Sequence, residues 1–127
     1  MNKLNTTAIA AAIALAFSHG AMATSMSLVD YKAGKASIAT EYKSARAGCD
    51  SFSANAKDVC MAEAKGKENV ANAELEAGYK PTTKTRYNVS IAKAQSDYSV
   101  AKEKCDTFAG DTKTACVKDA KVRFGQS

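Results

Sequence analysis

The sequence predicts an all-α protein made of two copies of one helical hairpin, each closed by a disulfide bond. The chain is rich in Ala, Lys and Glu, has a single proline and lacks the alternating pattern of strands. The phrase Cys-Asp-Ser-Phe at 49–52 returns 56 residues later as Cys-Asp-Thr-Phe at 105–108. A second cysteine follows each phrase at the same spacing, at Cys60 and Cys116. We therefore expect two duplicated hairpins in a small four-helix arrangement.

Residues 1–23 have the features of a signal peptide. Lys3 precedes an apolar segment that is too short to span a bilayer, and the small residues Ala21 and Ala23 follow it. We expect cleavage after Ala23, which leaves a mature chain without a transmembrane segment in the periplasm or outside the cell. Cleavage also removes His19, the only histidine, and lowers the formal net charge of +5 by one.

The first hairpin is predicted over 24–78, with a bend between its two cysteines. Asn55 is the expected cap of its second helix, which should cover 56–77 and end before Gly78. Apolar residues at helical spacing define one packing stripe on each helix. The stripe of the first helix is Tyr31, Ile38, Tyr42, Ala45, Cys49 and Phe52, and that of the second is Val59, Ala62, Gly66, Val70, Ala73 and Ala77.

A linker is predicted over 79–86, and the second hairpin over 87–127. The linker surrounds Pro81 and carries the only local excess of positive charge, a candidate contact for anions formed by Lys80, Lys84 and Arg86. The stripe of the next helix is Tyr87, Ile91, Ala94, Tyr98, Ala101, Cys105 and Phe108. Gly110 suits the left-handed end of that helix, Asp111 suits the cap of the next one, and the last helix should cover 112–124.

An even number of cysteines in an exported chain indicates a disulfide framework. A bend within each pair favours the local bonds Cys49–Cys60 and Cys105–Cys116, because the two cysteines then meet across the hairpin. An unbroken helix through each pair would place both cysteines on one face, since 11 residues are close to three turns. The crossed bonds Cys49–Cys116 and Cys60–Cys105 would then be expected. The break at Gly110 favours the local bonds.

The composition argues against most catalytic sites. Without histidine the mature chain lacks Ser-His-Asp and Cys-His nucleophilic sites and the zinc sites that need imidazole. The cysteine spacing does not match the closely spaced pairs of redox or zinc sites. We expect no enzyme activity, no catalytic residues, no cofactor and no bound metal. Because lysines alternate with acidic residues along the helices, a nucleic-acid partner is not expected either.

Short repeated phrases resemble those of small exported, Ala- and Lys-rich helical proteins of Gram-negative bacteria. They are Tyr42–Arg46, Asn55–Asp58 and Ala62–Lys65, with second copies at Tyr98–Lys102 and Lys118–Lys121. These proteins are loosely labelled as cell-envelope proteins and have no assigned activity. The resemblance implies a binding or structural role in the periplasm or envelope, with a protein or an anionic envelope component as partner.

Two other functions remain open at this point, and so does the oligomeric state. A cationic protein could coat an anionic envelope polymer, and its binding would weaken as the salt concentration rises. A thiol or metal carrier would need free thiols in the native protein. A homodimer is compatible with the helix seams, but no residue pattern fixes it.

Overall fold

A computed structural model describes residues 25–125, which fold into four α-helices and one short 3-10 turn. The predicted signal peptide lies outside these residues. The helices are α1 (Leu28–Gly48), α2 (Ala54–Tyr79), α3 (Thr83–Cys105) and α4 (Gly110–Arg123), with the 3-10 turn η1 at Cys49–Ser51. The described part of the chain contains no strand, so the predicted all-α class is confirmed. None of its helices is long and apolar enough to cross a membrane.

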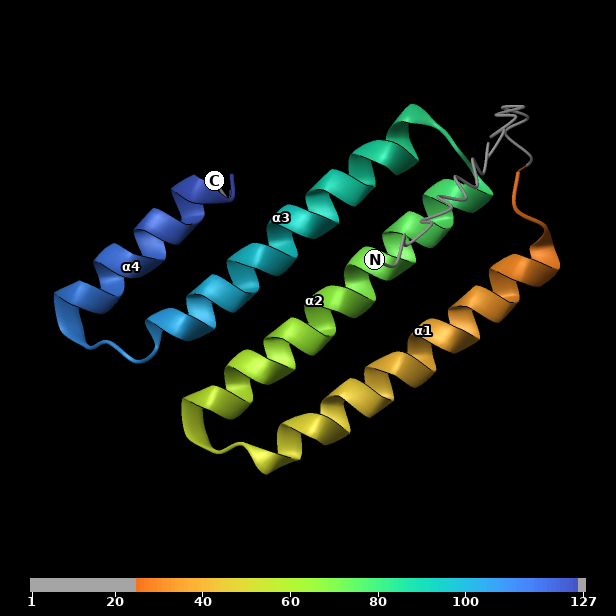
Figure 1. Cartoon of the computed structure of the whole chain (residues 1–127). Coiled ribbons are helices and arrows are strands. Elements are labelled where there is room, and N and C mark those ends of the chain that lie inside the picture. The colour runs from red at the N-terminus through yellow and green to blue at the C-terminus, as the bar shows by residue number, and fades with distance from the viewer. Residues whose placement is uncertain (1–24, 126–127) are drawn as a thin grey trace, which may run out of the picture.

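The four helices lie side by side in the order of the chain, each antiparallel to the one before it (Figure 1). Helix α1 packs against α2, α2 against α3, and α3 against α4, with no packing between non-consecutive helices in residues 25–125. Both hairpin bends lie at the same end of this row, and the connection between α2 and α3 lies at the other end (Figure 1). The two hairpins are therefore joined along α2 and α3, and the row stays open at α1 and α4.

Each hairpin is closed by its own disulfide. Cys49 is bonded to Cys60 and Cys105 to Cys116, with Cα–Cα distances of 5.6 and 5.7 Å. The predicted local pairing is confirmed, and the crossed alternative is wrong because the chain bends within each pair. Cys49 and Cys105 are fully buried, which places each bond between its two helices.

An ion pair recurs beside each disulfide. The Nζ atom of Lys57 lies 2.8 Å from a carboxylate oxygen of Asp50, and that of Lys113 lies 2.9 Å from Asp106. The hydrogen bond from Lys57, followed by the attraction of its charge, lowers the pKa of Asp50. The acidic residue after each first cysteine thus binds a lysine in the first turn of the next helix and helps to hold the bend.

The predicted caps of the second helices are wrong. Helices α2 and α4 each begin one residue before the predicted cap, Asn55 or Asp111, after the extended residues Ser53 and Ala109. Their first residues, Ala54 and Gly110, have positive φ angles of 49° and 56°. Ser53 and Ala109 therefore occupy the cap positions, and neither side chain makes a capping hydrogen bond.

Asn55 has a different role, because it links the two hairpins. Its side-chain amide donates a hydrogen bond of 2.6 Å to the backbone carbonyl oxygen of Glu103 in α3. The sequence favours a cap at this position because asparagine is common there. The contact with Glu103 depends on the packing of α2 against α3, which no local pattern reveals.

The segment between the hairpins is shorter than the predicted linker 79–86. Helix α2 ends at Tyr79 and α3 already begins at Thr83, so only three residues around Pro81 separate them. The hydroxyl of Thr82 accepts from the backbone N–H of Thr85, and the Thr85 hydroxyl accepts from the N–H of Thr82. This reciprocal cap starts α3 four residues before the predicted second hairpin.

Small residues allow α2 and α3 to approach closely. Gly66 and Ser96 are buried opposite each other, and the Ser96 hydroxyl donates to the backbone carbonyl oxygens of Gly66 (3.2 Å) and Ala92 (2.6 Å). A Cβ atom on Gly66 would lie only 3.0 Å from the Cβ of Ser96. The central interface therefore leaves little room for a side chain at position 66.

The two hairpins differ in how far their arms overlap. In the first, Tyr31 of α1 stacks on Tyr79 of α2, with ring centroids 4.5 Å apart, and its hydroxyl donates to Glu76 at 2.7 Å. This hydrogen bond, with a smaller effect of burial, raises the pKa of Tyr31. In the second hairpin, Tyr87 and Ile91 are 63% and 36% exposed. Their predicted place in a packed stripe is wrong, because α4 is too short to reach them.

Candidate binding groove

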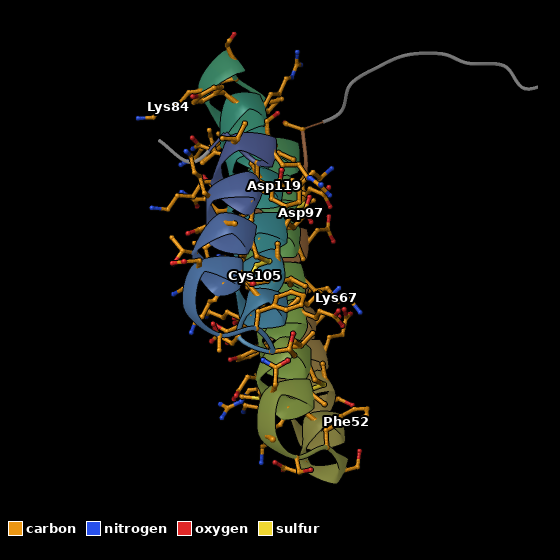
Figure 2. All side chains as sticks on the ribbon, turned by 90° about the vertical axis from the view of Figure 1, so that its left-hand side faces the viewer. Phe52, Lys67, Lys84, Asp97, Cys105 and Asp119 are labelled. Carbon is orange, nitrogen blue, oxygen red and sulfur yellow. A yellow bond between two sulfur atoms is a disulfide. The ribbon has the colours of Figure 1, made fainter. Side chains whose placement is uncertain are left out.

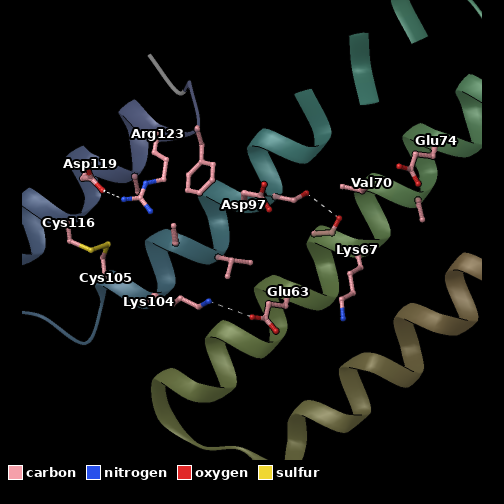
Figure 3. A pocket seen from close by; sticks show the side chains of 17 residues that line it. Glu63, Lys67, Val70, Glu74, Asp97, Lys104, Cys105, Cys116, Asp119 and Arg123 are labelled. Carbon is pink, nitrogen blue, oxygen red and sulfur yellow. Dashed lines mark hydrogen bonds and ion pairs between the residues drawn. A yellow bond between two sulfur atoms is a disulfide. The ribbon is translucent and has the colours of Figure 1, made fainter. Parts of the chain in front are cut away.

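A groove runs along α3 between α2 and α4 (Figure 3). It arises because α4 covers one side of α3 while α2 covers the other, which leaves a channel over the face between them. Its volume is about 720 Å³. Its lining comes from α2 (Glu63, Gly66, Lys67, Val70, Ala71, Glu74), from α3 (Ser96, Asp97, Val100, Ala101, Lys104, Cys105) and from α4 and the residue after it (Cys116, Asp119, Ala120, Arg123, Phe124).

The groove has an apolar lining between charged residues. Val70, Val100 and Ala101 are among its apolar residues, and the Cys105–Cys116 disulfide contributes to it as well. The disulfide fixes α4 against α3, so one wall of the groove is held to its floor by a covalent bond. A rigid, partly apolar channel between helices is a common form of binding site.

Charges of both signs lie along the groove. The Nζ of Lys104 lies 3.9 Å from a carboxylate oxygen of Glu63, and the guanidinium of Arg123 lies 3.1 Å from Asp119 (Figure 3). Lys67 and Asp97 also line the groove and form no side-chain ion pair or hydrogen bond with the rest of the described chain. These two side chains are available to a partner, one as a cation and one as an anion.

The cysteines offer no reactive thiol, because all four are in disulfides. Residues 25–125 also contain no group of three or more His, Cys, Asp or Glu side chains that could hold a metal ion. The groove therefore offers shape, apolar contact and separate charges. These are the properties of a surface that binds another molecule.

The predicted anion-binding residues lie outside the groove, at the other end of α2 and α3. Lys80 follows the last residue of α2, with its Nζ 5.5 Å from the centre of the Tyr79 ring. Lys84 and Arg86 lie in the first turn of α3 and are exposed. Residues two positions apart on a helix point in very different directions, so these two side chains do not converge.

Sequence patterns indicated parts of the groove but not the groove itself. Gly66, Val70, Ala101 and Cys105 belong to the predicted packing stripes, and the structure places all four in the lining. Lys67, Asp97, Asp119 and Arg123 were not selected. These residues come together only because the helices form an open row, and no pattern in the sequence predicted that row.

In comparisons with protein-family models, curated proteins and solved structures, nothing matches this chain. The groove and the internal duplication therefore carry the functional argument by themselves.

Proposed function

We propose that this chain is an exported, non-enzymatic helical protein that binds a protein partner through the groove between α2, α3 and α4. The groove carries this proposal, because it combines an apolar lining with a disulfide-fixed wall and two unpaired charges. The predicted signal peptide and the paired cysteines support a location in the periplasm or outside the cell. The resemblance to exported cell-envelope proteins points to the same compartments.

A protein partner is favoured over an anionic polymer by the distribution of charge. Six ion pairs join basic to acidic side chains in the described residues. Lys84 and Arg86 also point apart on α3. The positive charge is therefore spread over the surface, whereas a polymer-binding surface would concentrate it on one face.

Site-specific photo-crosslinking in the export compartment tests the proposal. A photoreactive amino acid is placed at Lys67, beside the groove, and in a matched variant at Lys32, on the exposed surface of α1. We expect a discrete protein adduct at position 67, none at 32, and loss of the adduct when Val100→Glu is added. Circular dichroism checks that this variant keeps its helices.

Two other outcomes would contradict the proposal. Equal crosslinking at both positions that fades as salt is raised would favour the anionic polymer. A thiol that reacts in the native protein before any reductant is added would favour a thiol or metal carrier.

A further inference from the structure

One face of α3 continues beyond the end of the groove without a partner helix. Tyr87 and Ile91 lie four residues apart and therefore share one side of the helix, with Lys84 one turn before Tyr87. Tyr87 is 63% exposed and Ile91 36%, and Lys84 forms no ion pair with any described residue. We call Lys84, Tyr87 and Ile91 the uncovered stripe.

The first hairpin shows how the equivalent face is covered. The repeat offset of 56 residues relates Tyr87 to Tyr31. The ring of Tyr31 stacks on Tyr79, and its hydroxyl donates to the Glu76 carboxylate at 2.7 Å. One turn along, the equivalent of Ile91 is Lys35, which donates to Asn72 at 2.9 Å. Leu75 packs on the neighbouring Gly34, since its Cδ1 would lie 2.7 Å from a Cβ added there. The second half of α2 thus supplies an aromatic ring, a carboxylate and an aliphatic side chain.

Within residues 25–125 the second hairpin has no such segment, because α4 stops early. Helix α4 ends at Arg123, and Gly125 follows with a φ of +64°, a left-handed conformation that ends helices. The same offset relates Gly125 to Asn69, where α2 continues as a helix to Tyr79. A glycine therefore follows α4 where α2 continues, and α4 does not cover Tyr87 as α2 covers Tyr31.

We infer that the uncovered stripe receives an acidic amphipathic helix of the partner protein, antiparallel to α3 and in line with α4. This inference rests on the proposed function and specifies the class of partner. The first hairpin provides the template for the apolar contacts and for a carboxylate opposite the tyrosine hydroxyl. Lys84 adds an unpaired cation on the same stripe, and a carboxylate on the partner helix would complement it.

A second copy of this chain is a less suitable occupant. Its segment with the right side chains is the second half of α2, and there Glu76 and Tyr79 already bind Tyr31. That segment would have to leave its own hairpin before it could bind the stripe of another copy.

The same segment provides a probe of known sequence. The peptide Glu-Asn-Val-Ala-Asn-Ala-Glu-Leu-Glu-Ala-Gly-Tyr-Lys, residues 68–80, contains three glutamates and one lysine and is therefore acidic. Because short helices are marginal in water, the peptide is locked as a helix by a lactam bridge away from its binding face. Fluorescence anisotropy measures its binding to the full, oxidised chain.

We expect saturable binding that Tyr87→Ala weakens at least tenfold and Lys84→Glu weakens several-fold. The matched control is Val29→Ala, which removes another exposed apolar side chain, from α1 (75% exposed), and should leave binding unchanged. Because all three side chains are exposed, the variants should keep the thermal unfolding temperature of the parent. A peptide with Glu76→Lys should bind more weakly than the original peptide.

The outcomes separate this inference from the proposed function. If the peptide fails to bind while the groove adduct at position 67 persists, the inference is overturned and the groove proposal stands. If both fail, both are overturned. Sedimentation that shows a dimer of the parent chain, lost in Tyr87→Ala, would assign the stripe to a second copy and overturn the partner helix.

Discussion

The first residue of α2 and that of α4 share a left-handed backbone but not the same side chain. Ala54 has a φ of 49° and Gly110 a φ of 56°. A left-handed conformation costs a residue with a Cβ atom about 1–2 kcal/mol, whereas glycine adopts it without this cost. The first copy of the hairpin therefore contains a strained position that the second copy has relieved.

Exchanging these residues tests that difference. We expect Ala54→Gly to raise the free energy of unfolding by roughly 0.5–1 kcal/mol and Gly110→Ala to lower it by about 1 kcal/mol. A Cβ atom at Gly110 would meet nothing within 4 Å, so the loss would come from the backbone alone. Urea denaturation measures both free energies of unfolding, and the m-values should stay unchanged. If both substitutions changed the free energy of unfolding in the same direction, the explanation would be contradicted.

Gly66 allows a second residue-level test, at the α2–α3 interface. Gly66→Ala brings a Cβ atom to 3.0 Å from the Cβ of Ser96, and we expect a loss of about 1–3 kcal/mol from overpacking. Gly48→Ala is the matched control, because position 48 is helical and open, and there alanine should be neutral or stabilising. Similar losses in both variants would show that close approach at position 66 is unimportant.

The Tyr31–Glu76 hydrogen bond predicts a pH dependence on the alkaline side. The pKa of Tyr31 is raised in the folded state, so the hydrogen bond stabilises the fold below the ordinary tyrosine pKa of 10.0. This contribution is lost as pH rises through the folded-state pKa of Tyr31. Ultraviolet titration should show one tyrosine that ionises at higher pH than the others, and Tyr31→Phe should remove this transition. Glu76→Gln should shift the transition to lower pH. An unshifted titration in Glu76→Gln would contradict the assignment.

At the scale of elements, the two terminal helices are held to different extents. Helix α1 has 21 residues and contacts α2 through the Tyr31 stack and the Lys35–Asn72 hydrogen bond (2.9 Å), in addition to its disulfide. Helix α4 has 14 residues and packs only on α3. We therefore conclude that α4 depends more strongly on its disulfide.

Removing each disulfide in turn should reveal this asymmetry. A bond that closes a loop of this size contributes about 2–3 kcal/mol. In Cys105→Ser/Cys116→Ser we expect amide hydrogen exchange to become fast across 110–123 while α2 and most of α3 stay protected. In Cys49→Ser/Cys60→Ser, α1 should lose less protection. Equal loss in the two terminal helices would contradict the asymmetry.

The sequence predicted the helices and their disulfides well because both depend on local patterns. Composition, spacing and the internal duplication indicated four helices and two bends. The start of α3 was misplaced because the Thr82–Thr85 cap was not recognised, and the start of α2 because Ala54 is an uncommon left-handed residue. Tyr87 and Ile91 fit a helical stripe, but periodicity does not say how far the neighbouring helix extends.

At the scale of the whole molecule, the open row of helices determines the candidate site. A closed bundle would bury the channel along α3, whereas the row leaves it accessible between α2 and α4 (Figure 3). Figure 2 views the row from the side of α4, so that α4 lies in front of the other helices. Asp97, Asp119 and Cys105 lie close together in this projection. The site thus depends on how the helices are arranged, which sequence patterns do not reveal because they describe one helix at a time.

The molecule consists of two copies of one hairpin, each closed by a local disulfide. Non-reducing peptide mapping by mass spectrometry tests this architecture, because trypsin cuts after Lys57 and Lys113, between the bonded cysteines. We predict two linked species, residues 47–57 joined to 58–65 and residues 105–113 joined to 114–118. Residues 47–57 joined to 114–118, or peptides with free thiols, would contradict the hairpins and the groove that depends on them.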